Sequence, residues 1–251
     1  MAIVGLSCRS AGVNSPDELW QTLFYKASSV SCDQTERVPF DVNEVFLEPL
    51  RYSAFLDDAF GFDSTFFSIS DVEAEHMDPQ QRLALELAWL AFEDSRMVPQ
   101  RVADSSSVGV FVGAMRDDFA SLVSRPAFAP NARSTLGSLR SVIAGRITHW
   151  FGFRGPSLVV DTGQSSSLVA ICQAVESLRK GECDVAIAGG VHLNLDPQAG
   201  RCIAELGVLS DDGVCRPFDR DANGYVRGEG GGFVVLKRAA DAERDKNKIY
   251  C

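Results

Sequence analysis

The stretch LVVDTGQSSSLVAICQAVESLRK, residues 158–180, decides the fold that we expect for this chain. Its apolar start, 158–160, predicts a strand, and a tight turn and a helix follow. Apolar side chains cover nearly the whole circumference of that helix, which predicts a buried helix. The serines at 165–167 supply hydroxyls for the free N–H groups at the helix start. We therefore expect Gln164 to lie deep at the mouth of a buried central helix, at the positive end of its dipole.

Gln164 occupies the place in which acyl-transfer enzymes hold a nucleophile, at a sharp turn between a strand and a helix. A glutamine side chain is not a nucleophile, and the simplest alternative is a polar residue that happens to start a helix. The permissive Gly163 directly before it favours a specialised turn. The form GxSxG of a serine hydrolase is absent from 163–167.

Composition narrows the class of protein. The 251 residues include 24 Lys and Arg against 34 Asp and Glu, a net charge of −10, so nucleic acid is not an expected partner. No apolar run reaches the roughly 18 residues of a membrane span. Seven scattered cysteines without a CxxC pair favour reduced thiols. We predict a cytoplasmic globular protein that binds neither nucleic acid nor membrane.

The order of predicted elements indicates an α/β protein with a mostly parallel central sheet. Beyond the central stretch we expect strands at 2–6, 108–112, 185–188 and 233–236, and helices at 16–26, 79–95, 136–151 and 239–246. Residues 27–62 read as an extended surface segment, and a proline-containing loop region reaches about Ser134. The final residues, 248–251, resemble the start of another strand, which predicts a truncated chain with an unpaired sheet edge.

Other motifs favour structural roles. The sequence 219–224 begins like a calcium loop, but its twelfth position falls on Gly230, and the carboxylate of Glu229 comes one residue early. The glycine-rich run 228–232 precedes a strand, so we expect it to allow close backbone packing, and no metal site is predicted. Of the three histidines, His192 is the one placed to reach a pocket, and a structural role is favoured for all three.

Several stretches together resemble the β-ketoacyl synthases, specifically ketosynthase-like domains of modular polyketide synthases. Besides VDTGQSSSLVA at 160–170, the matching segments are AIVGLSCR (2–9), MDPQQRL (77–83), VGVFVGAM (108–115), RGPSLVVDT (154–162), AGGVHLNL (188–195) and RPFDRDANGYVRGEGGGFVVLK (216–237). The resemblance implies a thiolase-like fold made of two related α/β halves. Residues 1–251 resemble the N-terminal half, and the C-terminal half is absent from the chain.

Two departures from the family pattern bear on the chemistry. Gln164 stands at the position of the family's nucleophilic cysteine, as in the glutamine-type (KSQ) domains of loading modules, and the family's two catalytic histidines lie beyond residue 251. The resemblance implies a domain that decarboxylates malonyl- or methylmalonyl-acyl carrier protein to make a starter unit. It also makes Met115, after the 108–112 strand, a candidate for the wall of the acyl pocket.

The resemblance implies no cofactor other than the phosphopantetheine that carries the substrate on the acyl carrier protein. It implies contacts with other polyketide synthase domains and a homodimer that pairs through the strand near Val159. The alternative is a non-catalytic partner of an active ketosynthase, similar to a chain-length factor, or an inert fragment.

Overall fold

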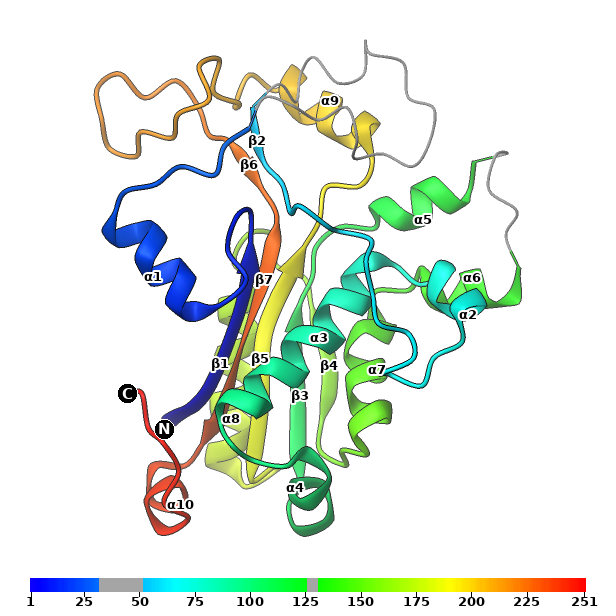
Figure 1. The fold of residues 1–251 in the computed structure, drawn as a ribbon, viewed down its shortest axis with the longest axis vertical. Helices are drawn as coiled ribbons and strands as arrows, with labels where there is room; N and C mark the ends of the chain where they lie inside the picture. The colour runs from blue at the N-terminus through cyan, green and yellow to red at the C-terminus, as the bar shows by residue number, and fades with distance from the viewer. Residues whose placement is uncertain (32–51, 126–130) are drawn as a thin grey trace.

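The computed structural model describes residues 1–31, 52–125 and 131–251. Its centre is a sheet of five strands in the order β1 (Ala2–Ser10), β7 (Gly230–Lys237), β5 (Val185–His192), β3 (Val108–Gly113) and β4 (Ser157–Val160) (Figure 1). The apolar runs predicted as strands are all present. β5 continues through Gly189 and Gly190, where the sequence predicted its end.

The sheet is mixed, so the prediction of a mostly parallel sheet is wrong. β3 pairs in parallel with β4 and β5, whereas β7 is antiparallel to both β5 and β1. The connection from β5 to β7 carries α9 (Pro197–Glu205) and stays at one end of the molecule (Figure 1). Because the chain does not cross back over the sheet, β7 starts at the end where β5 stops and runs in the opposite direction.

Helices cover both faces of the sheet. α3 (Pro79–Asp94) contacts β1, β5 and β7 and packs beside α7 (Ser141–Phe151), while α8 (Ser166–Lys180) contacts β3, β4 and β5 on the opposite face (Figure 1). The side chains of β3 divide accordingly: Val110 and Val112 belong to the larger core, and Phe111 belongs to the core under α8. This alternation follows from the two-residue period of a strand.

The central helix α8 is buried along one side, and the prediction of burial around nearly its whole circumference is wrong. Ala170, Ala174 and Leu178 are buried against the sheet. Leu168, in contrast, is 67% exposed, and Cys172 is also exposed. A helix that lies on a sheet turns only one stripe toward it, and no other element of the described chain covers the outer side of α8 to a comparable extent.

Shorter elements surround this frame. They are α1 (Pro16–Phe24), β2 (Ser53–Ala54), α2 (Asp71–Glu75), α4 (Pro99–Ser105), α5 (Asp118–Val123), α6 (Ala132–Gly137), β6 (Arg227–Gly228) and α10 (Ala239–Arg244). The loop region predicted before Ser134 contains α5 and the start of α6, and the helix predicted at 136–151 is interrupted between α6 and α7. Much of the predicted extended segment, 32–51, lies outside the described residues, as do 126–130.

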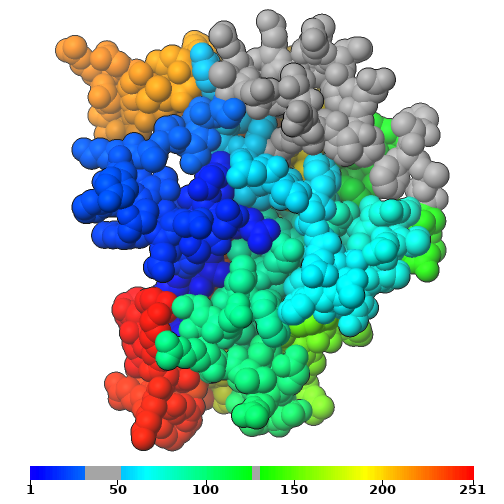
Figure 2. Space-filling view, in the orientation of Figure 1, coloured from blue at the N-terminus to red at the C-terminus, as the bar shows by residue number. Residues whose placement is uncertain are grey.

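The last residues do not form the predicted strand, although they bind the edge of the sheet. The Ile3 N–H donates to the Cys251 carbonyl oxygen over 3.0 Å, and the Tyr250 N–H donates to the Ile3 carbonyl oxygen over 2.9 Å. Figure 1 and Figure 2 both show the two chain ends beside each other. The β1 edge is therefore partly paired at Ile3. At the other edge, β4 has β3 as its one partner among the described strands.

Candidate active site

A compact turn carries Gln164 between β4 and α8. The Gly163 N–H donates to Asp161 Oδ1 over 3.1 Å, and Gly163 has a φ of +66°, which favours glycine. Arg140 donates to the Asp161 carboxylate and forms an ion pair with Asp117 at 2.6 Å. The hydrogen bond from Arg140 is the main reason why the pKa of Asp161 lies below its ordinary value. The turn is thus tied to the start of α7 on one side.

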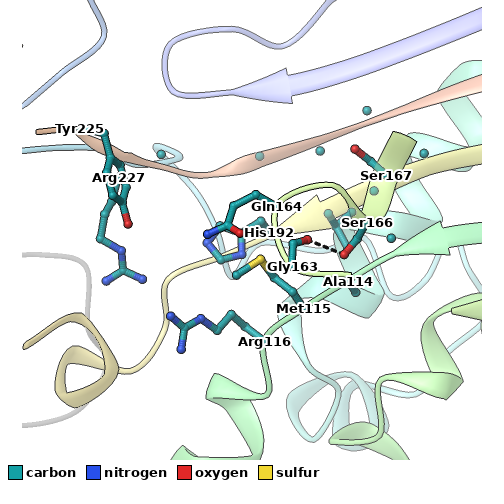
Figure 3. A pocket seen from close by; sticks show the side chains of 18 of the residues that line it. Ala114, Met115, Arg116, Gly163, Gln164, Ser166, Ser167, His192, Tyr225 and Arg227 are labelled. Atoms are coloured by element: carbon teal, nitrogen blue, oxygen red, sulfur yellow. Dashed lines mark hydrogen bonds between the residues drawn. The ribbon is translucent and has the colours of Figure 1, made fainter. Parts of the chain in front are cut away.

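The serines after Gln164 close this turn, whereas the sequence predicted that they would cap the helix. The Ser166 hydroxyl accepts the Thr162 N–H at 3.0 Å and donates to the Gly163 carbonyl at 2.5 Å (Figure 3). Ser165 donates to the Thr162 carbonyl at 2.9 Å and makes no capping bond, although it is the N-cap residue of α8. These bonds fix the direction in which Gln164 leaves the helix start.

The start of α8 lies directly on two strands because both carry glycine at the contact. A Cβ atom on Gly113, at the end of β3, would be 2.5 Å from the Ser167 nitrogen. A Cβ on Gly190 in β5 would be 2.8 Å from the Ser167 Cβ. Real side chains do not approach that closely, so the two glycines allow the helix end to rest on the sheet.

A cavity of about 1130 Å³ opens at this end of the sheet. Its walls include Gly163, Gln164, Ser166 and Ser167 around the start of α8, and the segments at the ends of β3 and β5 (113–116 and 188–192). Residues 225–228 and 230–232, before and within β7, and Ile203, Leu206 and Val208, in and after α9, also line it. Ligand sites in open α/β sheets commonly occupy the space beyond the carboxyl ends of parallel strands. The fold therefore places the Gln164 turn on the wall of a pocket that is large enough for a small-molecule group.

Both predicted site residues line this cavity. Gln164 comes from the turn before α8 and Met115 from the segment after β3, and Figure 3 shows their side chains in the same pocket. Met115 is half-buried. Gln164 stands at the helix mouth as predicted, but its side chain is exposed in this chain, so the expectation that it lies deep is wrong. Gln164 stays exposed because, among the described elements, the sheet alone covers α8 extensively.

His192, at the end of β5, also lines the cavity, as its sequence position suggested. Its Nε2 lies 3.2 Å from Asn194 Oδ1, and its buried Nδ1 has no hydrogen-bond partner within the described part of the chain. Burial lowers the pKa of His192, and the charge of Arg227 acts in the same direction. The ring is therefore neutral at pH 7, its Nε2–H donates to Asn194 Oδ1, and its Nδ1 is left as an acceptor without a partner among the described residues.

Two arginines of the cavity were not predicted from the sequence. Arg227, in β6, is 5% exposed and donates to Asn194 Oδ1, and Arg116 follows Met115. Burial lowers the pKa of Arg227, the charge of Arg116 adds to that shift, and Asp118 opposes it. The signals available in the sequence were the adjacency of Arg116 to Met115 and the place of Arg227 within the family-matching segment 216–237.

Glu229 and the glycine-rich run 228–232 make backbone contacts that hold neighbouring segments close together. Both carboxylate oxygens of Glu229 accept backbone N–H groups, from Asn194 at 2.6 Å and from Leu56 at 3.2 Å. A Cβ on Gly231 would be 2.7 Å from a Leu87 methyl carbon, which shows why this run needs glycine. Within 1–31, 52–125 and 131–251, no group of three or more His, Cys, Asp or Glu side chains has the arrangement of a metal site. In the same ranges, no helix combines the length and apolar character needed to cross a bilayer.

Known proteins are similar to this chain in sequence and in fold. Residues 1–242 match the profile described as "Beta-ketoacyl synthase, N-terminal domain". The chain belongs to the β-ketoacyl synthase family. Among curated members, it is 48% identical over 256 residues to polyketide synthase GfsA of Streptomyces halstedii, an alignment that covers the whole chain. It is 41% identical over 256 residues to 6-methylsalicylic acid synthase of Aspergillus niger, with 99% of the chain covered.

Solved ketosynthases confirm the thiolase-like α/β fold of this β-ketoacyl synthase domain. The ketosynthase from module 6 of the bacillaene synthase of Bacillus subtilis 168 superimposes with a TM-score of 0.87 at 36% identity. The oxazolomycin ketosynthase domain OzmH KS7 of Streptomyces albus JA3453 gives a TM-score of 0.88 at 32% identity. Each alignment covers 99% of the chain and 41% or 43% of the neighbour. The chain spans 3% of the length of GfsA and 14% of the length of 6-methylsalicylic acid synthase.

Proposed function

We propose that this chain is the N-terminal half of a ketosynthase-like domain that decarboxylates malonyl- or methylmalonyl-acyl carrier protein to make a polyketide starter unit. One observation carries the proposal: Gln164, at the position of the family's nucleophilic cysteine, lines the cavity at the start of α8 together with Met115. The chain then supplies the pocket wall, and a C-terminal half supplies the catalytic histidines.

The chemistry of the carboxamide favours decarboxylation over condensation. A cysteine thiolate at a helix N-terminus accepts an acyl group and then transfers it to an extender. The amide nitrogen of Gln164 has a delocalised lone pair, so no acyl-enzyme forms and carbon–carbon bond formation has no donor. The glutamine instead fills the space of an acylated cysteine.

Decarboxylation needs no nucleophile. The bond between the carboxylate carbon and the α-carbon breaks, CO₂ leaves, and the electron pair becomes the enolate of the thioester, which then takes a proton from water to give the acyl-carrier protein. In comparable oxyanion sites, each donor directed at the developing negative charge lowers the activation free energy by about 3 kcal/mol. Donors directed at the enolate oxygen should act in the same way. We assign that role to the histidines of the second half. The backbone N–H of Gln164 is an additional donor.

The proposal includes two kinds of partner. An acyl carrier protein brings its phosphopantetheine-bound substrate to the open side of the cavity, where Gln164 is exposed. A second copy of the domain pairs antiparallel with β4, which is an edge strand of the sheet. Other polyketide synthase domains lie on the same polypeptide.

The test uses the full-length protein and measures CO₂ release from malonyl-acyl carrier protein, with mass analysis of the enzyme. We expect CO₂ and acetyl-carrier protein to form without acylation of the protein, and Gln164→Ala to reduce the rate. Gln164→Cys should instead become acylated when it is given an acetyl thioester. Absence of CO₂ release, with Gln164→Ala behaving identically, would reject decarboxylation and favour a non-catalytic partner of the chain-length-factor type.

A further inference from the structure

The charged side chains on the cavity wall have one sign. The ionisable residues that line it are Arg116, His192, Tyr225 and Arg227, and no aspartate or glutamate is among the described residues of the wall. The chain as a whole carries a net charge of −10. A cavity with two guanidinium groups and no carboxylate in so acidic a chain is suited to an anion.

Arg227 is buried without an ionic partner among the described residues. Its Nη2 donates to the amide oxygen of Asn194, and its buried Nη1 has no hydrogen-bond partner in the described part of the chain. The nearby carboxylates are engaged elsewhere: Asp118 Oδ2 accepts the Leu195 and Asp196 N–H groups at 3.1 and 3.2 Å, and Glu229 accepts two backbone N–H groups. A buried cation with an unused hydrogen-bond donor destabilises the folded state unless a ligand binds it.

Arg116 comes from the segment after β3, and its side chain also has a donor without a partner among the described residues. Its backbone carbonyl accepts Gln80 Nε2 at 3.2 Å, which fixes the start of the side chain. Its buried Nε has no hydrogen-bond partner in the described part of the chain. Figure 3 shows Arg116 and Arg227 extending into the same pocket as Gln164 and His192. The charges of both arginines lower the pKa of His192, so their fields overlap at this ring.

Resting on the function proposed above, we propose that Arg116 and Arg227 form a carboxylate-binding subsite that selects acyl thioesters bearing a free carboxylate, the malonyl class. A guanidinium binds a carboxylate with two parallel hydrogen bonds. The unpartnered Nη1 of Arg227 and the guanidinium N–H groups of Arg116 are donors of this kind. The subsite thus distinguishes malonyl thioesters from acetyl thioesters, because an acetyl group has no carboxylate.

The subsite acts on binding and not on bond breaking. The carboxylate is charged in the bound substrate and becomes neutral as CO₂ leaves, so the contact with arginine is strongest before the reaction. An interaction of that kind lowers KM without accelerating the chemical step. Arg116 and Arg227 are thus specificity residues, in contrast to the donors that stabilise the enolate.

The experiment measures binding of two unreactive pantetheine amides to the full-length protein by calorimetry, one with a malonyl group and one with an acetyl group. Both probes have the same arm, so a contact with the arm affects them equally. We expect the malonyl probe to bind more tightly than the acetyl probe at low salt. Arg116→Met should weaken malonyl binding by about tenfold to a hundredfold and leave acetyl binding unchanged.

Two further variants complete the test. Arg220→Met removes a cation that is 91% exposed and does not line the cavity, so it should change neither affinity. Arg227→Lys keeps the charge and loses the two-pronged geometry, and its KM for malonyl-carrier protein should rise while kcat does not fall. Equal weakening of both probes in Arg116→Met would show that the arginines bind the phosphopantetheine arm, and no change in either would show that they are structural.

Failure of this inference is distinguishable from failure of the proposed function. If the wild type releases CO₂ but Arg116→Met binds the malonyl probe normally, the subsite is rejected and the decarboxylase assignment stands. If no CO₂ is released but the two probes are discriminated through Arg116, the subsite stands and the proposed reaction is rejected.

Discussion

The Ser166 hydroxyl donates to the Gly163 carbonyl oxygen over 2.5 Å and accepts the Thr162 N–H over 3.0 Å, so one buried side chain closes the turn that carries Gln164. The bond runs backward from the first helical residue to the glycine with positive φ. The serine-rich sequence around Gln164 therefore shapes the turn, and the position of the Gln164 side chain depends on it.

Ser166→Ala should destabilise the fold by about 1–3 kcal/mol, because the Thr162 N–H loses its partner in a partly buried place. Urea denaturation followed by circular dichroism measures this loss. Ser165→Ala is the matched control: the Ser165 hydroxyl is exposed and its deletion should cost less than about 1 kcal/mol. Equal costs for the two serines would contradict a special role of Ser166 in the turn.

Gly113→Ala should destabilise the fold by about 1–3 kcal/mol, because the added Cβ would meet the backbone of Ser166 and Ser167 at 2.5–2.8 Å. Either the start of α8 moves away from β3 or the strand shifts. The control is Gly145→Ala within α7, where a Cβ meets no atom within 4 Å, and this change should stabilise by up to about 1 kcal/mol. Thermal denaturation gives both values, and a neutral Gly113→Ala would show that the contact is loose.

Asp78 should make stability depend on pH. It is 2% exposed at the N-cap of α3, and burial raises its pKa from 3.8 to about 6. A carboxyl group with a raised folded-state pKa favours folding most when it is protonated, so its contribution falls as the pH rises from about 4 to about 6. The difference of roughly two pKa units corresponds to about 3 kcal/mol.

Asp78→Asn removes this titration and keeps an oxygen to accept the Gln80 N–H, which Asp78 Oδ1 now accepts at 2.8 Å. We expect the stability of the variant relative to wild type to increase by about 3 kcal/mol between pH 4 and pH 7. Denaturant titrations of both proteins at each pH isolate the effect, because the other groups titrate alike in the two. A difference independent of pH would show that burial does not raise the pKa of Asp78.

Val159 is the residue on which we test dimer formation. The β3–β4 ladder uses the carbonyls of Pro156 and Val160, which accept the Val110 and Ala114 N–H groups at 2.7 and 3.1 Å. In a parallel pair, alternate residues of a strand bond to the same neighbour, so the N–H and carbonyl of Val159 point to the free edge. Val159→Pro removes a donor from that edge without removing a bond to β3.

We expect Val159→Pro to convert a dimer of the full-length protein into monomers, measured by sedimentation velocity over a range of concentrations. Circular dichroism should show unchanged secondary structure. A variant that sediments as the wild-type dimer would place the interface elsewhere.

Much of the fold could be predicted from local patterns. The apolar runs of β3 and β5 and the strand–turn–helix at 158–180 were recognisable because each is a short, buried, hydrophobic segment bounded by turn residues. The direction of β7 was not, because it depends on where the connection after β5 travels. The burial of α8 was overestimated for a related reason: an apolar side chain indicates what a helix can bury, and the neighbours decide what it does bury.

The sequence by itself determined the family and the strand–turn–helix stretch, and its resemblance to the family predicted Gln164 at the position of the nucleophile, with Met115 and His192 as candidate pocket residues. Only the tertiary structure brought Arg116 and Arg227 to one cavity and showed that their donors have no carboxylate to bind among the described residues. The physical reason is that the energy of a buried charge depends on what surrounds it in space. Residues distant in the chain set those surroundings, so no local pattern of residues records them.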